Sequence, residues 1–197
     1  ATFALERDGG IMVTASHNPP DYNGLKLVRE KSKPIGSDTG LKDIAAMIAS
    51  GTLPPLAKPA GLIRPQDTSS LYIDHLLSYV DRSKLRKLKV VVDAGNGGAG
   101  LIIDKLEPYL PFEFIKVRHE PDGTFPQGVP NPMLEENRGP TLEALKRSGA
   151  DVAIAWDGDY DRCFLFDEHG GFIEGYYIVG LLASVFLPYW HMELVAP

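Results

Sequence analysis

Short apolar runs alternate with segments of helical periodicity through the second half of the chain. The runs are rich in β-branched and aromatic residues and are four to six positions long, which is typical of buried strands. We expect strands at Lys89–Val92, Phe112–Val117, Val152–Trp156 and Cys163–Phe166, and helices at Gly98–Leu106 and Thr141–Arg147. This alternation predicts an α/β protein with mixed, mostly parallel sheets flanked by helices.

The amino-terminal part of the chain has a sparser apolar pattern. Ile11–Ala15 is apolar and β-branched, and Leu25–Val28 resumes an extended segment after a loop rich in proline and asparagine. Apolar residues then recur at helical spacing between Asp38, a candidate N-cap, and Gly51, a candidate stop. We therefore expect two strands and one helix here.

A proline-rich stretch separates this part from the strand–helix alternation. Residues 52–66 contain four prolines and little periodicity, so they are the best candidate for a linker. Asp67 or Ser69 then opens a further helix.

Composition and charge narrow the class of protein. The 197 residues carry 20 basic and 26 acidic side chains, and this net charge of −6 argues against nucleic acid or anionic lipid as a partner. The longest apolar run, Ile178–Leu187, is too short to span a bilayer, so we expect no membrane partner. Cys163 is the single cysteine, which suits a reducing compartment. No signal peptide is visible, and we expect a cytoplasmic protein.

A glycine-rich stretch, Asp93–Gly100, follows one of the expected strands. It contains a formal G-x-G-x-x-G pattern, and Glu120 lies at a plausible distance for a ribose carboxylate. Asp93, however, places a negative charge where a pyrophosphate would have to approach. We favour a tight strand-to-helix turn that needs small residues for packing.

Three aspartates at alternate positions form the strongest chemical cluster in the sequence. Asp157, Asp159 and Asp161 come directly after an apolar strand, where α/β proteins place their ligands. Like-charge repulsion would keep the three carboxylates apart, and a divalent cation resolves that conflict because Mg²⁺ takes hard oxygen ligands. The pattern therefore predicts a Mg²⁺ site.

Two other interpretations of the acidic loop compete with the magnesium site. A calcium loop would have Glu168 at position 12, but its position 6 is Arg162 rather than glycine, and its flanks are strands rather than helices. A solvated acidic turn is the second alternative, although such turns rarely lie between two apolar strands.

A serine at the end of the first expected strand has three interpretations. Ser16 and His17 could be a nucleophile–base pair, but adjacent strand residues point to opposite faces, so we do not expect direct pairing. Ser16 could simply form a turn before Asn18 and Pro19. It could also carry a phosphoryl group beside a metal, with Lys26 supplying positive charge or a proton.

The chain resembles the α-D-phosphohexomutase family. The resemblance is carried by ordered motifs: Thr14–Pro19 with Tyr22–Lys26, Asp93–Gly97, Pro121–Pro126 with Pro130–Pro132, and Asp157–Arg162. Two further segments, Cys163–Glu168 and Glu174–Leu182, are most similar to the bacterial phosphomannomutases that supply GDP-mannose synthesis. The resemblance implies phosphoglucomutase-type α/β/α domains. It also implies that the glycine-rich stretch is a structural turn.

The resemblance also implies roles for individual residues. Ser16 would be the phosphorylated serine, and Asp157, Asp159 and Asp161 would hold Mg²⁺ together with an oxygen of the seryl phosphate. Three further residues correspond to family positions: Lys26 to a proposed general acid/base, His17 to the histidine beside the serine, and Arg162 to the arginine that closes the metal loop. The implied partners are hexose phosphate and hexose bisphosphate.

The family has four domains, and the resemblance covers only part of them. It implies that residues 1–66 are the later part of domain 1 with the phosphoserine loop, that 67–171 are domain 2 with the metal loop, and that 172–197 begin a truncated domain 3. The sugar-recognition loop of domain 3 and the phosphate-clamping loop of domain 4 have no counterpart here. Residues 188–197 resemble nothing in the family.

These observations leave three hypotheses. The leading one is a phosphohexomutase, an isomerase that interconverts mannose 6-phosphate and mannose 1-phosphate, with the glucose phosphates as further candidates. A second is a fragment that loses phosphate from the serine–Mg²⁺ site to water, as a phosphatase does. The third is a non-catalytic folded fragment that packs against the missing domains or associates with itself.

Overall fold

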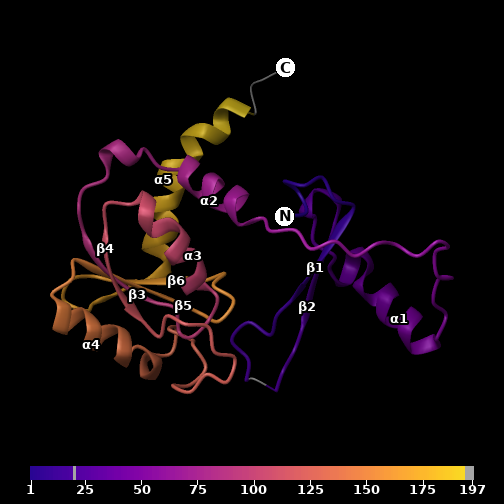
Figure 1. Cartoon of the computed structure of the whole chain (residues 1–197), viewed down its shortest axis with the longest axis horizontal. Coiled ribbons are helices and arrows are strands. Elements are labelled where there is room, and N and C mark those ends of the chain that lie inside the picture. The colour runs from indigo at the N-terminus through magenta and orange to yellow at the C-terminus, as the bar shows by residue number, and fades with distance from the viewer. Residues whose placement is uncertain (20, 194–197) are drawn as a thin grey trace. The chain divides into compact units, whose positions relative to one another are not determined.

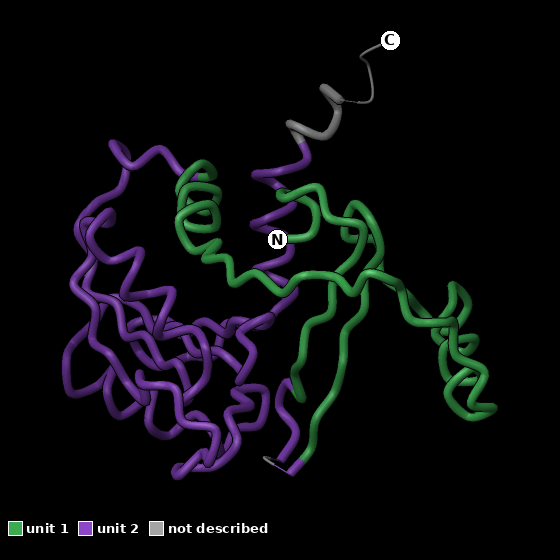
Figure 2. Tube along the Cα trace, turned by 45° about the vertical axis from the view of Figure 1, so that its right-hand side comes forward, with its two compact units in different colours: residues 1–15, 22–79 green, residues 16–21, 80–197 purple. Residues whose placement is uncertain are grey.

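The computed structural model describes residues 1–19 and 21–193, with side chains described as far as Leu187. The chain divides into two compact units (Figure 2). The first contains residues 1–15 and 22–79, and the second contains residues 16–21 and 80–197. Pro20 and residues 194–197, the end of the segment that resembles nothing in the family, lie outside the described residues.

The second unit is built on a five-stranded sheet with the order β4-β3-β5-β6-β7 (Figure 1). Its strands are β3 (Lys89–Asp93), β4 (Glu113–Val117), β5 (Val152–Trp156), β6 (Cys163–Phe166) and β7 (Phe172–Ile173). β3 pairs in parallel with β4 and β5, whereas β5 with β6 and β6 with β7 are antiparallel. The α/β class is confirmed, and the sheet is mixed.

The antiparallel half of the sheet follows from the length of its connections. Only residues 157–162 join β5 to β6, and a parallel crossover needs a dozen residues or more. The chain therefore reverses and pairs Trp156 with Cys163. β7, with two residues, is too short to have left an apolar pattern in the sequence.

Helices cover both faces of this sheet (Figure 1). On one face, Val91 of β3 packs in a cluster with residues of α4 (Gly139–Ser148) and with Phe166 of β6. On the other face, Val90 and Val92 pack with residues of α3 (Ala99–Leu106). Successive strand residues point to opposite faces, so the unbroken apolar runs that predicted these strands are buried on both sides.

The first unit contains a hairpin and two helices. β1 (Gly9–Val13) and β2 (Leu25–Arg29) are antiparallel, and α1 (Lys42–Ser50) and α2 (Ser69–Ser78) follow. β1 begins and ends two residues earlier than expected, and the chain turns at Ser16 and His17. Residues 52–68, all described, contain no helix or strand, as their prolines predict.

The ends of α1 test the two expected helix signals. Gly51 adopts the left-handed conformation with φ of 68° and ends the helix, as expected. The Asp38 cap is wrong, because α1 is preceded by a short helical segment, η2 (Ser37–Leu41), whose N-cap is Gly36. There the Thr39 hydroxyl, rather than the Asp38 carboxylate, accepts the Gly36 N–H at 2.7 Å.

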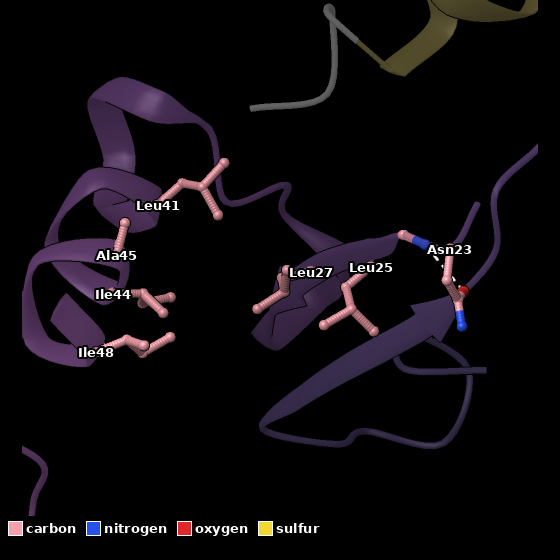
Figure 3. Close-up of a pocket in the computed structure, with 8 residues that line it drawn as sticks. Asn23, Leu25, Leu27, Leu41, Ile44, Ala45 and Ile48 are labelled. Atoms are coloured by element: carbon pink, nitrogen blue, oxygen red, sulfur yellow. Dashed lines mark hydrogen bonds between the residues drawn. The ribbon is translucent and has the colours of Figure 1, made fainter. Parts of the chain in front are cut away.

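An apolar groove of about 600 Å³ lies between α1 and the hairpin of the first unit. Side chains of α1 and β2 face each other across it (Figure 3). It is lined by Asn23, Gly24, Leu25, Leu27, Leu41, Ile44, Ala45 and Ile48.

The remaining helices are short except for the last. The short ones are η1 (Glu30–Ser32), η3 (Arg82–Lys84), η4 (Glu107–Tyr109) and η5 (Glu135–Asn137). The last is α5 (Gly175–Glu193), which covers the apolar run at Ile178–Leu187. Within the described part of the chain, no helix has both the length and the apolar character needed to cross a membrane.

Candidate functional site

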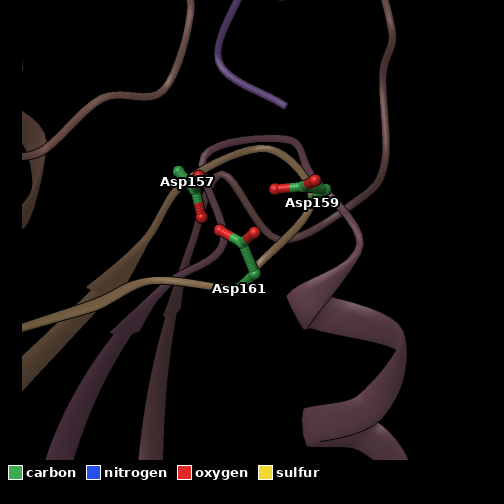
Figure 4. Close-up of side chains that lie close together, drawn as sticks. All are labelled: Asp157, Asp159 and Asp161. Carbon is green, nitrogen blue, oxygen red and sulfur yellow. The ribbon is translucent and has the colours of Figure 1, made fainter. Parts of the chain in front are cut away.

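The acidic loop between β5 and β6 gathers the three aspartates. The Asp157 N–H donates to the Arg162 carbonyl at 3.4 Å, and the Tyr160 N–H donates to the Asp157 carbonyl at 3.1 Å. Tyr160 has a positive φ of 49°, which tightens the turn. The carboxylates of Asp157, Asp159 and Asp161 consequently converge, with oxygens that all lie within 4.8 Å of one another (Figure 4).

Burial differs along the loop. Asp157 is fully buried, Asp159 is half-buried, and the Asp161 side chain is 51% exposed. Arg162 compensates the buried charge, because its Nε and Nη2 donate to Asp157 Oδ2 at 3.0 and 2.6 Å. The Arg162 backbone N–H also donates to Asp157 Oδ1 at 3.2 Å. Arg162 thus offsets the charge of the buried Asp157 carboxylate.

This set of donors fits a hard divalent cation. Carboxylate oxygens are the ligands that Mg²⁺ and Ca²⁺ take in proteins, and these come from one short, well-anchored loop. The loop is flanked by strands β5 and β6, so it is not the helix-flanked calcium loop of the rejected alternative.

Ser16 lies beside the acidic loop although 141 positions separate it from Asp157 in the sequence. Its hydroxyl donates to Asp159 Oδ1 at 3.1 Å, and Asp157 Oδ2 lies 3.4 Å from the same oxygen. Residues 16–21 belong to the same compact unit as the acidic loop. The fold therefore brings the serine and the acidic cluster together.

The expectation that Ser16 and His17 point away from each other is wrong. Ser16 Oγ and His17 Nδ1 lie 3.2 Å apart. The alternation rule fails because β1 has already ended and Ser16 adopts a positive φ of 55°. Arg162 Nη2 lies 2.6 Å from the same His17 nitrogen. A guanidinium can only donate, so Nδ1 accepts and the proton of a neutral His17 ring lies on Nε2.

The backbone at Ser16 packs closely against Gly158 of the acidic loop. A Cβ at Gly158 would lie 2.7 Å from the Ser16 carbonyl oxygen, closer than a real Cβ approaches. It would also contact Phe125 at 3.6 Å and Pro130 at 3.7 Å. The sequence alone assigned no role to Phe125 or Pro130. Their positions in the motifs Pro121–Pro126 and Pro130–Pro132, which resemble the family, could have indicated one.

The glycine-rich stretch is a tightly packed turn. Gly95 has a positive φ of 58°, and a Cβ at Gly97 would collide with the backbone of Gly158. A Cβ at Gly98 would meet the Tyr160 ring. The Glu120 carbonyl oxygen accepts a hydrogen bond from Asn96 Nδ2 at 2.9 Å. These contacts support the interpretation as a structural turn.

Lys26 belongs to β2 of the first unit, where it pairs with Met12 and is exposed. The second unit brings together Ser16, His17, Arg162 and the three aspartates. The acid–base role of Lys26 therefore stays a prediction.

Comparison with known families identifies the class of this α/β/α fold. A family model described as phosphoglucomutase/phosphomannomutase, alpha/beta/alpha domain I, matches residues 1–54. The model described as alpha/beta/alpha domain II of the same family matches residues 70–171.

Individual relatives agree with the family models. The chain is 60% identical over 186 residues to a protein of Xanthomonas campestris pv. campestris (strain B100) named phosphohexose mutases, covering 94% of this chain and 41% of the relative. It is 56% identical over 193 residues to a phosphomannomutase of Salmonella montevideo, covering 95% of this chain and 42% of the relative.

A solved structure shows the same fold. The X-ray structure of a phosphoglucomutase/phosphomannomutase family protein from Burkholderia thailandensis matches with a TM-score of 0.82 and 31% identity, covering 93% of this chain and 39% of that one. The chain belongs to the phosphoglucomutase/phosphomannomutase family. It spans about two fifths of the length of the curated relatives it matches.

Proposed function

We propose that the chain is part of a phosphohexomutase that interconverts mannose 6-phosphate and mannose 1-phosphate through a phosphoserine and a hexose bisphosphate. The observation that carries this proposal is the hydrogen bond between Ser16 Oγ and Asp159, at 3.1 Å, in a cluster with two more aspartates. Clustered carboxylates beside the hydroxyl would repel an anionic phosphoryl group unless positive charge is also present.

The proposed site would hold Mg²⁺ with Asp157, Asp159 and Asp161 and with an oxygen of the phosphate on Ser16. When bound, the ion supplies the positive charge that offsets the carboxylates and the transferring phosphoryl group. The chain's own residues then position the reactants. Asp157, held by the Arg162 fork, keeps the loop in place, and the hydrogen bond to Asp159 orients the serine oxygen.

The transfer itself exchanges one oxygen–phosphorus bond for another. As the Ser16 Oγ–P bond forms, the bond between the phosphorus and the sugar oxygen breaks. The serine proton must leave and the sugar oxygen must gain one. We assign Lys26 as the general acid/base, with His17 beside the serine and Arg162 near the phosphoryl group. Phosphoryl transfer relies on positioning and charge neutralisation, which these residues provide.

The substrate and cellular context are further parts of the proposal. The names of the bacterial relatives support mannose phosphates, with the glucose phosphates as further candidates, and hence a role in supplying GDP-mannose. A cytoplasmic location is consistent with the single cysteine and the chemistry of sugar phosphates. The domain division proposed above, at residues 66/67 and 171/172, is supported by the ranges of the two family models.

Mass spectrometry of the intact chain tests the proposal. Incubation with glucose 1,6-bisphosphate or mannose 1,6-bisphosphate and Mg²⁺ should add one phosphoryl group, mapped to Ser16 by peptide sequencing. The S16A variant should stay unlabelled. The S83A variant, which removes an exposed serine in η3, should be labelled like the parent chain.

Three outcomes would contradict the proposal in different ways. Labelling that persists in S16A would remove Ser16 from the reaction. Free phosphate released without any labelled chain would favour the phosphatase-like alternative. Absence of both labelling and phosphate release would favour a non-catalytic fragment.

A further inference from the structure

A buried charge at the end of β3 takes no part in the chemistry described above, although its residue pairs with Ala155, two positions before Asp157. Asp93, the last residue of β3, is fully buried. A buried carboxylate is strongly unfavourable unless it is paired and fully hydrogen-bonded. The hydrogen bonds of Asp93 therefore show which parts of the fold this buried carboxylate holds together.

Four donors satisfy the Asp93 carboxylate. Arg118, whose side chain is 5% exposed, donates from Nε to Oδ1 at 2.9 Å and from Nη2 to Oδ2 at 2.7 Å. Thr141, buried on α4, donates its hydroxyl to Oδ2 at 2.6 Å. The Gly95 N–H donates to Oδ1 at 3.0 Å. β3, the end of β4 and α4 thus meet at one carboxylate, and the two-pronged Arg118 contact fixes its orientation.

The cluster fixes the turn that follows β3. The Gly95 N–H is held by Asp93 itself, and the Asn96 N–H donates to the Arg118 carbonyl at 2.7 Å. At the far end of this turn, the Gly98 N–H donates to the Gly158 carbonyl at 3.1 Å. Gly158 lies between Asp157 and Asp159 in the acidic loop. An unbroken chain of contacts therefore runs from Asp93 to the proposed metal ligands.

We propose that Asp93, Arg118 and Thr141 are positioning residues that hold the acidic loop in its metal-binding shape through the Gly95–Gly98 turn. The role in metal binding rests on the proposed function, whereas the mechanical link between the turn and the loop does not. The buried charge is unfavourable in itself, but its hydrogen bonds restrain the turn. If the turn loosened, the acidic loop would spread because its carboxylates repel one another.

The T141V variant tests the link with little change in side-chain volume. It removes one hydrogen bond from Asp93 and leaves the Arg118 pair intact, so the chain is expected to fold. The matched control is L145V, which trims a buried side chain one turn further along α4 without contacting Asp93. D93N is the stronger variant, because it leaves the buried Arg118 without a counter-charge.

Two measurements separate positioning from a general loss of stability. Amide hydrogen exchange in the 197-residue chain compares Gly98 with Val91, a core residue of β3 that reports global opening. In T141V, exchange at Gly98 should rise about tenfold relative to Val91, the size expected for one lost hydrogen bond to a charged group. L145V should not raise that ratio, because it acts on global opening alone. Titration with Mn²⁺ should show a dissociation constant raised about threefold to tenfold in T141V and unaltered in L145V.

The two measurements also separate this proposal from the one on which it rests. Exchange at Gly98 that rises only in step with Val91 would overturn the positioning role. A raised Gly98 ratio with unaltered Mn²⁺ affinity would also overturn it, because the loop would then not depend on the turn. A parent chain that binds no Mn²⁺ would instead overturn the metal site of the proposed function, while the exchange ratio would still report the mechanical link.

Discussion

The two compact units contain opposite balances of buried and exposed apolar surface. In the second unit, all three central positions of β3 are buried, with α3 and α4 covering the two faces. In the first unit, Ile73 is the one buried residue among those the structure describes. Its hairpin exposes more than 60% of Ile11, Met12 and Val13.

Strand number explains much of this difference. A sheet of five strands with helices on both faces removes its apolar residues from water, whereas an isolated two-stranded hairpin is marginal in stability. The groove between α1 and β2 shows apolar side chains facing each other across open space (Figure 3). The acidic loop therefore belongs to the unit with the closed core, whereas Lys26 belongs to the unit with the exposed hairpin.

The largest loss of stability is expected when a buried side chain of the second unit is truncated. F166A removes a fully buried ring that packs against Phe172 and should lower the free energy of unfolding of the second unit by about 3–5 kcal/mol. I63A removes a side chain that is 98% exposed in the first unit and should change stability by no more than about 0.5 kcal/mol. Urea denaturation followed by far-UV circular dichroism, which reports the helices and strands of both units, measures both variants. Equal losses in the two variants would break the comparison.

The turn that contacts the acidic loop of the second unit should tolerate no added side chain at Gly97. G97A places a methyl group against the Gly158 backbone, where neither chain segment can yield easily, and should cost about 1–3 kcal/mol. It should also weaken Mn²⁺ binding. G123A meets no atom within 4 Å and is the control. Thermal unfolding and Mn²⁺ titration check both variants, and a G97A chain that behaves like G123A would contradict the packing described here.

The smallest expected effect concerns a surface ion pair between α3 and β4. A hydrogen bond from Lys116 and one from His119 hold the pKa of Asp104 below its ordinary value. A depressed carboxyl pKa contributes stability above the unfolded-state pKa, about 3.9, and that contribution is lost as pH falls through the lower folded-state pKa. Because the Asp104 side chain is 47% exposed, D104N should cost no more than about 1 kcal/mol at pH 7.

Urea denaturation at several pH values checks the Asp104 prediction. The difference between D104N and the parent chain should be present from neutral pH down to about pH 5 and close below about pH 4. High salt should shrink it at pH 7 by screening the exposed pair. A difference that does not depend on pH would show that the carboxylate charge is not responsible.

The sequence predicts the fold where the information is local. Runs such as Val152–Trp156 are apolar on both faces, and Gly149 and Gly51 end helices by adopting the left-handed conformation. The expected Asp38 cap failed for an equally local reason. Asp38 lies inside η2, and the Leu41 N–H, which an Asp38 cap could have bound, donates to the Gly36 carbonyl oxygen at 2.9 Å.

The site was predictable only in part, because its contacts span long sequence separations. The predicted Mg²⁺ site required the three aspartates to converge, and their carboxylate oxygens do lie within 4.8 Å of one another. The environment of Asp93 was not predictable from its neighbours, since Arg118 and Thr141 lie 25 and 48 positions away. The apposition of Ser16 and His17 was missed because a single positive φ overrides the alternation of a strand.

Phosphorus NMR of the phosphorylated chain tests the central claim most directly, because it asks whether one ion contacts both the serine and the acidic loop. After incubation with a hexose bisphosphate, the phosphoserine resonance should broaden at less than one equivalent of Mn²⁺. In D159N, a much higher concentration should be needed. A phosphoserine signal that stays sharp at one bound equivalent, or that broadens equally in D159N, would contradict a shared site formed by Ser16 and the three aspartates.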